Sequence, residues 1–377
     1  MIIAVNARFL LKDYLEGYGN FIFETCSRLA KKHPEHQFLY IFDRAFDPTI
    51  ITAGNITPVI IGPEARHPIL WQYWYNYKLP ALVRKYKADV LLSPDGFCSL
   101  RTRIPQCLVI HDLAFLHHPA FIKKSHLRYY KKNTPLFASK AASIATVSEF
   151  SKNDLIQQYA IPASKINVVY NGIASAFQPF NWADKESIKA NYTAGKEYFL
   201  YIGAIHPRKN LMNLLKAFSL FKKRQKSNMQ LLIAGRLAWD YEQFSESLKT
   251  YKYRQDVQLL GYLPQDQLAS ITAAAYALVY PSFFEGFGVP IVEAMQSGVP
   301  VITSNTSSMP EIAGSAALLA DPHSISDLAE QMMRIFKDES LRNELIQKGF
   351  EQSNKFSWDK TADLLWESIL QAVETKK

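Results

Sequence analysis

Short runs of β-branched and aromatic residues alternate with helical patterns along the whole chain, and this alternation constrains the fold more than any other feature. It is typical of parallel α/β units, in which a helix connects two neighbouring strands. In the first half, strands are predicted at Ile2–Asn6, Gln37–Phe42, Asp89–Ser93, Gln106–Ile110, Ser143–Val147 and Asn167–Tyr170, and helices at about Tyr18–Lys32, Leu70–Tyr86, Ser125–Ser139 and Glu149–Tyr159. In the second half, strands are predicted at Tyr198–Ile202, Gln230–Ala234, Gln258–Leu259, Tyr276–Tyr280 and Val299–Thr303, and helices at about Leu211–Arg224, Asp240–Tyr251, Gln265–Ala274, Pro290–Gln296, Ser326–Lys337 and Ser340–Ser353.

The periodicity fails between the two halves, where Pro179, Asn181 and Gly195 lie among mixed polar residues. We therefore expect an interdomain linker over 173–196, between an N-terminal domain over 1–172 and a C-terminal domain over 197–357. The 377 residues are enough for two domains of usual size. The fold class predicted is α/β, with two Rossmann-like domains facing each other across a cleft and ligands bound in the loops that follow the strands.

The positive charge of the chain lies in its first half. Residues 1–173 contain 21 Lys and Arg against 12 Asp and Glu, whereas the remainder contains 22 of each. A field of this sign attracts a phosphate-bearing ligand, an anionic membrane surface or nucleic acid. The alternative is that the excess Lys and Arg side chains only keep the surface of this half solvated. No nucleic-acid recognition motif accompanies the charge, so we expect no nucleic acid among the partners.

The cysteines and the apolar segments favour a cytoplasmic protein. Three cysteines, Cys26, Cys98 and Cys107, are an odd number without metal-ligand spacing, which is typical of buried thiols in a reducing compartment. The N-terminal sequence lacks a cationic region and a cleavage site and is interpreted as a strand. The apolar stretch from Leu268 to Phe284 divides into a helix and a strand, so we do not expect a membrane span.

The segment Tyr280–Met295, YPSFFEGFGVPIVEAM, carries the strongest functional pattern. A buried strand is followed by a loop with Glu285 and the Gly286-Phe287-Gly288 turn, and then by a helix with Pro290 near its first position. Glycines let backbone N–H groups approach a ligand closely, and a helix N-terminus favours phosphate. Glu293, expected in the first helical turn, and Glu285 each offer a carboxylate to the hydroxyls of a sugar. The alternative for Glu293 is a carboxylate that only stabilises the helix dipole.

A second candidate site is LYIGAIHPRKN, from Leu200 to Asn210, where Arg208 and Lys209 lie between a strand and a helix. An arginine fork and a lysine point charge suit a diphosphate, and both would stabilise the negative charge that grows on a leaving nucleoside diphosphate. This is a way to carry out the chemistry without a metal ion. A solvated Arg-Lys pair is the alternative.

Two weaker candidates lie in the first half. His111 and Asp112 follow a predicted strand, where the histidine could donate a hydrogen bond to a sugar hydroxyl or stabilise positive charge at the anomeric carbon; a histidine fixed by Asp112 is the alternative. His117 and His118 are interpreted as structural, or as residues that support the site without contacting the ligand, because no carboxylate or thiol set at ligand spacing surrounds them. Gly17 and Gly19 in EGYGNF resemble a loop that approaches phosphate, although most such glycine pairs are only turns.

These motifs together resemble the retaining glycosyltransferases of family 4, which have the GT-B fold and carry an E-x7-E motif at this place. The resemblance covers nearly the whole chain. It implies that Glu285 contacts the hexose of the donor, that Glu293 contacts the nucleotide ribose, and that His111 lies in the active site in an HDL-type motif. It also implies that the last helix, from about Trp358 onward, crosses back to the N-terminal domain.

The chain departs from many family members at Ala204, where they carry a basic residue. The adjacent Arg208 and Lys209 are similar to the mannosyltransferase-like branch, which implies that Arg208 replaces the missing cation. The catalytic residues implied are His111, Glu285, Arg208 and Lys209, and the donor-binding residues are Gly19, Gly203, Arg208, Lys209, Gly261, Tyr262, Glu285, Gly286, Phe287, Gly288, Val289 and Glu293. No metal site and no cofactor are implied.

The expected function is the transfer of a hexose from a nucleoside diphosphate sugar, with GDP-mannose as the first choice, to a glycan or lipid-linked saccharide. The alternatives are a GT-B nucleotide-sugar epimerase, a sucrose/trehalose-type synthase or a sugar-binding protein. Two basic and aromatic segments, RHPILWQYWYNYKLPALVRKYK and FIKKSHLRYYKKN, could contact the cytoplasmic face of a membrane. Their alternative is amphipathic helices with the aromatic side chains packed inward.

Overall fold

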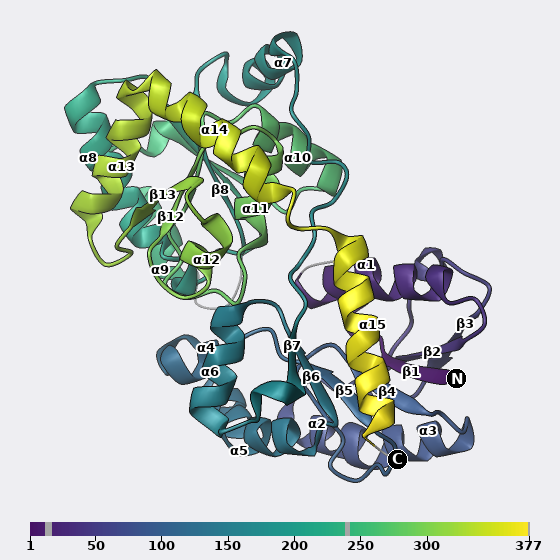
Figure 1. Cartoon of the computed structure of the whole chain (residues 1–377). Coiled ribbons are helices and arrows are strands. Elements are labelled where there is room, and N and C mark those ends of the chain that lie inside the picture. The colour runs from purple at the N-terminus through teal and green to yellow at the C-terminus, as the bar shows by residue number, and fades with distance from the viewer. Residues whose placement is uncertain (12–16, 238–241, 376–377) are drawn as a thin grey trace. The chain divides into compact units, whose positions relative to one another are not determined.

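The computed structural model describes residues 1–11, 17–237 and 242–375. The chain forms two compact units, each built around a parallel sheet (Figure 1). The first unit comprises Met1–Gly172 and Ser357–Lys377, and the second comprises Ile173–Phe356. The C-terminal helix therefore belongs to the same unit as the N-terminal strand.

The described residues of the first unit form a seven-stranded sheet with the order β3-β2-β1-β4-β5-β6-β7. All of its neighbouring strands are parallel. The strands are β1 (Ile2–Asn6), β2 (Gln37–Phe42), β3 (Ile56–Ile60), β4 (Val90–Ser93), β5 (Gln106–Val109), β6 (Ser143–Thr146) and β7 (Ile166–Val168).

Helices cover both faces of this sheet. They are α1 (Tyr18–Lys32), η1 (Pro48–Ile50), α2 (Pro68–Tyr73), η2 (Trp74–Lys78), α3 (Leu79–Lys85), α4 (Ala114–His117), η3 (Pro119–Phe121), α5 (Lys124–Lys140), α6 (Glu149–Tyr159), η4 (Ala163–Lys165) and α15 (Trp358–Glu374). Side chains of α2, α3 and α5 share one apolar core with Ala4, Leu91 and Ile144. The neighbouring Ser143 points to the opposite face, as alternation along a strand requires, and its hydroxyl donates to the Ser368 carbonyl of α15 over 2.6 Å.

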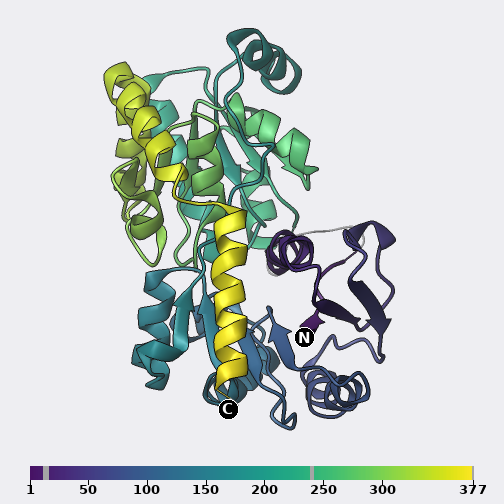
Figure 2. The same cartoon turned by 45° about the vertical axis from the view of Figure 1, so that its right-hand side comes forward.

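Helix α15 runs along the sheet of the first unit and packs against α1 (Figure 1 and Figure 2). Its buried residues Trp358, Leu365 and Ile369 recur at the spacing of one helical face, so a single apolar stripe faces the sheet. The helix begins sharply because the Ser357 hydroxyl accepts a hydrogen bond from the Asp359 N–H over 3.2 Å.

The helical stretch from α2 to α3 contains one π-helical turn, η2. Pro80 explains it, because proline has no N–H to bond the carbonyl four residues earlier, at Asn76, and its ring would clash with that carbonyl. The chain widens at that point into a turn with bonds five residues apart. The predicted helix over Leu70–Tyr86 is therefore three consecutive helical segments.

The described residues of the second unit form a six-stranded parallel sheet with the order β10-β9-β8-β11-β12-β13. Its strands are β8 (Tyr198–Ile202), β9 (Gln230–Ala234), β10 (Val257–Gly261), β11 (Ala277–Tyr280), β12 (Val301–Ser304) and β13 (Ala317–Ala320). Its helices are α7 (Trp182–Thr193), η5 (Pro207–Lys209), α8 (Leu211–Gln225), α9 (Glu242–Lys249), η6 (Arg254–Asp256), α10 (Gln265–Ala273), α11 (Val289–Gln296), α12 (Met309–Ala313), α13 (Ile325–Lys337) and α14 (Glu339–Ser353).

The structure differs from the sequence expectation in a few elements. Helix α7 occupies the segment predicted as a linker; the Asn181 side chain caps it by accepting from the Asp184 N–H over 2.9 Å. Strands β3 and β13 were not predicted, and both lie at sheet edges. The start expected for α9, at Asp240, lies outside the described residues, and the described helix begins at Glu242.

Candidate active site

The candidate site of the second unit lies where the strand order reverses, between β8 and β11. These two strands are parallel neighbours, although β9 follows β8 in the sequence and lies on its other side. In open α/β sheets, ligands bind beyond the carboxyl ends of the strands at such a point, because the connecting loops diverge there. The loops that carry Arg208-Lys209 and Glu285 follow β8 and β11, so the topology brings these residues together.

The loop after β8 is closely packed. Gly203 has a φ of 145°, and a Cβ atom there would lie 2.8 Å from the Tyr201 hydroxyl. Gly235, after β9, lies still closer, since its Cβ would meet the Gly203 carbonyl oxygen at 1.9 Å. The positive φ of Gly203 favours glycine there, and the close approach of the Gly203 backbone requires glycine at position 235.

The short helix η5 presents the two cations. The His206 side chain caps it by accepting from the Arg208 N–H over 3.2 Å. Asn210 ends it with a left-handed backbone, and its side chain donates to the carbonyl oxygens of Pro281 (2.9 Å) and Pro322 (2.7 Å). These bonds hold η5 against the loop after β11.

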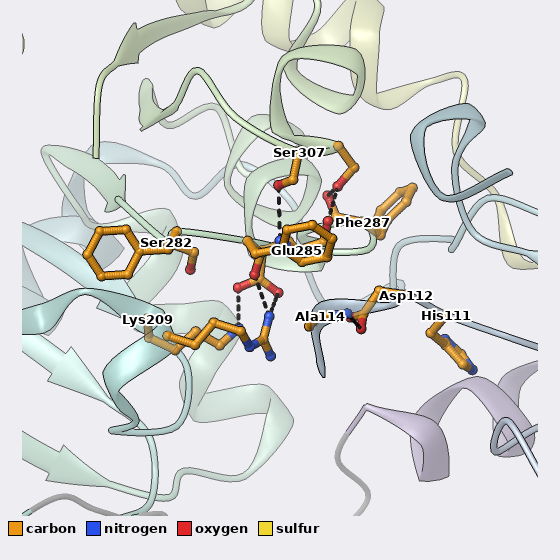
Figure 3. Close-up of polar contacts among 12 residues, drawn as sticks. His111, Asp112, Ala114, Lys209, Ser282, Glu285, Phe287 and Ser307 are labelled. Atoms are coloured by element: carbon orange, nitrogen blue, oxygen red, sulfur yellow. Dashed lines mark hydrogen bonds and ion pairs between the residues drawn. The ribbon is translucent and has the colours of Figure 1, made fainter. Parts of the chain in front are cut away.

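Glu285 forms ion pairs with both cations (Figure 3). Its Oε1 lies 2.6 Å from the Lys209 Nζ, and its Oε2 lies 3.2 Å from the Arg208 guanidinium. Burial alone would raise the pKa of Glu285, but Arg208 and Lys209 outweigh it and lower that pKa to about 2. Glu285 is therefore ionised throughout the physiological range, and the three side chains together carry one excess positive charge.

Tyr280, the last residue of β11, also holds Lys209. Its hydroxyl accepts a hydrogen bond from the Lys209 Nζ over 2.8 Å, and the ammonium lies 5.2 Å from the centre of the tyrosine ring. The ring stacks on that of Tyr201, with 6.2 Å between centroids. Glu285 and Tyr280 thus define the rotamer of Lys209 before any ligand binds.

Side-chain donors hold each consecutive backbone carbonyl from Tyr280 to Glu285. Hydroxyls from β12 and the segment after it supply four of them, and two come from η5 and its end. The pairs are Thr303 to Tyr280 (3.0 Å), Asn210 to Pro281 (2.9 Å), Ser304 to Ser282 (2.7 Å), Thr306 to Phe283 (3.1 Å), Arg208 to Phe284, and Ser308 to Glu285 (2.9 Å). The Glu285 N–H in turn donates to the Ser307 hydroxyl over 3.0 Å (Figure 3). We call Thr303, Ser304, Thr306 and Ser308 the hydroxyl row.

Helix α11 begins directly after the glycine turn. Gly288 is its N-cap with a φ of 97°, a conformation that favours glycine, and Pro290 lies in its first turn as predicted. The expectation that Glu293 lies in the first turn is wrong, because the helix starts at Val289 and its first turn contains no acidic residue.

The Glu293 carboxylate is buried, and no described residue donates a hydrogen bond to it or pairs with it. Burial raises the pKa of Glu293 to about 8, because the charged form is poorly solvated there. The two glutamates of the motif therefore differ: Glu285 is an ionised group with two cations, and Glu293 holds its proton at neutral pH.

The remaining predicted donor residues lie on the same edge of the sheet or near it. Gly286 and Phe287 form the buried turn before α11, and the Phe287 ring packs edge-on against Phe356 at 5.4 Å. Gly261 ends β10 with a φ of 69°, and the following Tyr262 is 42 % exposed.

His111 lies in the first unit, after β5. Its Nε2 lies 3.0 Å from the Pro94 carbonyl oxygen, which can only accept, so the proton is on Nε2. Burial lowers the pKa of His111, and the rings of Tyr18 and Phe21 lie edge-on at 4.7 and 5.0 Å. The Nδ1 of the neutral ring is therefore an acceptor. The expectation that His111 donates a hydrogen bond to a sugar hydroxyl becomes the expectation that the His111 Nδ1 accepts one from that hydroxyl.

Neighbouring predictions in the first unit have different outcomes. Asp112 does not fix His111; its carboxylate accepts from the Ala114 N–H over 2.9 Å (Figure 3). His117 pairs with the buried Asp154 over 2.8 Å, in agreement with a structural role. Gly19 lies buried inside the first turn of α1, not in the loop before it, because the helix begins at Tyr18.

The described residues contain neither a cluster of metal-ligand type nor a helix of membrane-spanning type. No group of three or more His, Cys, Asp or Glu side chains there could hold a metal ion. Likewise, no described helix is both long enough and apolar enough to cross a membrane.

Two Rossmann-type sheets with a charged site at a switch point define an enzyme of the GT-B architecture. Residues 184–352 match the family model of glycosyl transferases group 1, and residues 15–177 match that of glycosyltransferase family 4. The O-antigen chain mannosyltransferase B of Escherichia coli is 32% identical over 361 residues, which cover 93% of this chain and 94% of that protein. The chain belongs to the group 1, family 4 glycosyltransferases.

Two further matches agree with this assignment. The O-antigen chain mannosyltransferase RfbU of Salmonella typhimurium is 28% identical over 72% of each chain. Among solved structures, a sucrose-phosphate synthase from Thermosynechococcus elongatus superposes with a TM-score of 0.79 over 97% of both chains, at 18% identity. The structural match supports the fold, and the sequence matches support the activity class.

Proposed function

We propose that the chain transfers a hexose from a nucleoside diphosphate sugar to a hydroxyl of a glycan or lipid-linked saccharide, with retention of anomeric configuration and without a metal ion. The observation that carries the proposal is the buried arrangement of Arg208, Lys209 and Glu285 at the switch point of the second sheet. Its excess positive charge suits an anionic group, and its fixed geometry requires little reorganisation when a ligand binds.

The two cations are assigned to the donor diphosphate. As the bond between the sugar and the diphosphate breaks, negative charge grows on the leaving group, and Arg208 and Lys209 stabilise it in place of a metal ion. The acceptor hydroxyl approaches the face from which the diphosphate departs, and a phosphate oxygen takes its proton. No dedicated protein nucleophile is needed for this route.

The two glutamates are assigned to the two sugar rings of the donor. Glu285, always ionised, accepts hydrogen bonds from hydroxyls of the hexose. Glu293, buried without a described partner, accepts the vicinal hydroxyls of the nucleotide ribose. His111 accepts from a sugar hydroxyl through its Nδ1, and the glycine turn before α11 provides N–H groups for the diphosphate.

Mannose is the hexose we propose, with GDP-mannose as the donor. Two relatives that match over 93% and 72% of the chain are named as mannosyltransferases. The sucrose-phosphate synthase match keeps open an acceptor that is a small sugar or sugar phosphate, as in the sucrose/trehalose-type synthases. An epimerase would use the same diphosphate site but release an isomerised nucleotide sugar.

Transfer assays with a panel of nucleoside diphosphate sugars test the proposal. We expect labelled mannose to move from GDP-mannose to a saccharide acceptor in the presence of EDTA, without isomerisation of unused donor. Lys209→Ala should reduce kcat by at least about 100-fold, since it removes a fixed positive charge that stabilises the leaving diphosphate. Lys216→Ala, an exposed lysine of α8, is the matched control and should leave kcat unchanged.

Three outcomes would contradict the proposal. Near-wild-type turnover of Lys209→Ala would remove that residue from the mechanism. Loss of transfer in EDTA would exclude the metal-independent route, and an isomerised donor without transfer would favour the epimerase.

A further inference from the structure

Two long stretches of the first unit contain no acidic residue. Residues 65–88 and 113–148 have no Asp or Glu but contain eleven exposed cations: Arg66, Lys78, Arg84, Lys85, Lys87, Lys123, Lys124, Arg128, Lys131, Lys132 and Lys140. Arg66 pairs with Glu64 over 2.5 Å. None of the other ten forms an ion pair with any residue that the structure describes. Their charge therefore remains available to an external anion.

The fold places these two stretches next to each other. Helices α2 and α5 are in contact (Figure 1). The Gln72 side chain of α2 donates to the Asn133 side chain of α5 over 3.0 Å. The Trp71 ring packs edge-on against Tyr129 at 5.1 Å beneath them. The inward-facing aromatic residues thus form the core, as the sequence alternative supposed, while the cations remain outside. We call the exposed surface of α2, η2, α3 and α5 the basic face.

The basic face also exposes large apolar side chains. Ile69, Tyr73 and Tyr77 are 76 %, 43 % and 51 % exposed, and Leu136 on α5 is 47 % exposed. Residues four apart in an α-helix drift by about 40° around its axis. The π turn from Trp74 to Lys78 has more residues per turn and reverses this drift. Ile69, Tyr73 and Tyr77 consequently lie in one row.

Cations flank this apolar row. The Arg101 guanidinium lies 4.2 Å from the centre of the Tyr77 ring, and the Lys78 ammonium lies 5.7 Å from that of Tyr73. Each tyrosine therefore presents an apolar ring beside a positive charge. Such pairs match the boundary between acyl chains and anionic headgroups, where tyrosines are enriched and basic residues contact phosphate.

We propose that the basic face binds the surface of an anionic lipid bilayer, with Ile69, Tyr73 and Tyr77 entering the headgroup region and the surrounding lysines and arginines contacting lipid phosphates. A nucleic acid would satisfy the charges, but it offers no apolar phase for Ile69 and Leu136. The proposal does not rest on the proposed reaction, although it would bring the enzyme to lipid-linked acceptors.

Vesicle sedimentation of the full-length chain tests this proposal. At about 0.1 M salt we expect binding to phosphatidylcholine vesicles that contain about 30 % phosphatidylglycerol, and little binding to pure phosphatidylcholine. Lys131→Glu/Lys132→Glu should lower the partition coefficient onto anionic vesicles by at least about tenfold, because two positive charges that attract lipid phosphates become two negative charges that repel them. Tyr73→Ser/Tyr77→Ser should also weaken it by several-fold, since it removes the apolar contacts.

Matched variants in the second unit control for general effects of charge and exposure. Lys223→Glu/Arg224→Glu changes two adjacent exposed cations on α8, and Trp182→Ser removes a tryptophan that is 77 % exposed. Both should bind vesicles like the wild type, and all variants should keep the wild-type melting temperature. Absence of binding to anionic vesicles at low salt would overturn the proposal. So would equal losses in the control variants, or a preference for single-stranded DNA over vesicles of equal charge.

Discussion

At the scale of single residues, the site depends on hydroxyl groups as well as on its charges. Sequence patterns singled out Glu285, Arg208 and Lys209, since charged residues in loops directly after buried strands can be distinguished from ordinary solvated surface charges. They did not identify Tyr280 or the hydroxyl row. Serine and threonine are common throughout the chain, and their role here arises only because β12 pairs with β11. That pairing is a long-range feature which no local pattern reports.

Ser308→Ala should lower the stability and the kcat of the protein without unfolding it. Its hydroxyl lies 2.9 Å from the Glu285 carbonyl oxygen and 3.1 Å from that of Phe287, on either side of Gly286. Losing this buried donor should cost about 1–2 kcal/mol of stability and lower kcat, because Glu285 would be less well fixed. Chemical denaturation and steady-state kinetics measure both. Ser187→Ala, at an exposed position of α7, is the control and should change neither.

Glu293 should make both stability and nucleotide binding depend on pH. Its pKa is raised to about 8 in the folded state from 4.5, so between these values folding takes up a proton. The contribution of this group to stability is therefore greatest below pH 4.5 and falls as the pH rises toward 8. Glu293→Gln should remove that fall and make the protein more stable than the wild type near pH 8, by a few kcal/mol at most, as measured by denaturation across pH.

If Glu293 binds the ribose as a carboxylate, nucleotide binding should release its proton at pH 7. Calorimetric titration with a nucleoside diphosphate in buffers of different ionisation enthalpy measures this release directly. Glu293→Gln should abolish it. Binding without proton release by the wild type would contradict the assigned role.

At the scale of elements, sequence periodicity located strands and helices whose apolar pattern is strong. The strands β1, β2, β8 and β9 and the helices α1 and α6 have the predicted bounds. Strand β3 was missed because Pro58 interrupts it and three of its five residues are exposed. Helix α7 was missed because few of its residues are buried, which leaves little helical pattern. Elements that bury few residues leave weak sequence signals.

The docking of α15 shows which contacts of an element matter. Leu365 is fully buried against the first sheet, whereas Lys32 on α1 reaches the exposed Asp363 of α15 over 2.7 Å. Leu365→Ala should cost about 2–5 kcal/mol, since it leaves a cavity in the core. Lys32→Ala should cost less than about 1 kcal/mol, because exposed ion pairs are weak. Equal losses in denaturant titrations would show that the ion pairs hold this helix as strongly as the apolar stripe does.

At the scale of the whole molecule, charge and chemistry are divided between the two units. Residues 1–172 carry a net charge of +9 and residues 357–377 carry −1, so the first unit accounts for +8 of the total of +9. Arg208, Lys209, Glu285 and Glu293 all lie in the nearly neutral second unit. The positive field of the first unit is therefore not needed to explain the candidate diphosphate site, and the basic face is a separate feature that requires its own partner.

The same division predicts how a truncated chain behaves. Removing residues 357–377 takes α15 from the first unit and uncovers the apolar face that Trp358, Leu365 and Ile369 bury. The second unit is continuous from Ile173 to Phe356 and loses nothing. Calorimetry should therefore show the transition of the first unit lowered or lost and that of the second unit retained. A nucleoside diphosphate at about 100 times its Kd should still stabilise the retained transition by about 2.7 kcal/mol, because every assigned residue of the diphosphate site remains. A uniform loss of structure, or a retained transition that no nucleotide shifts, would show that the site needs the first unit to form.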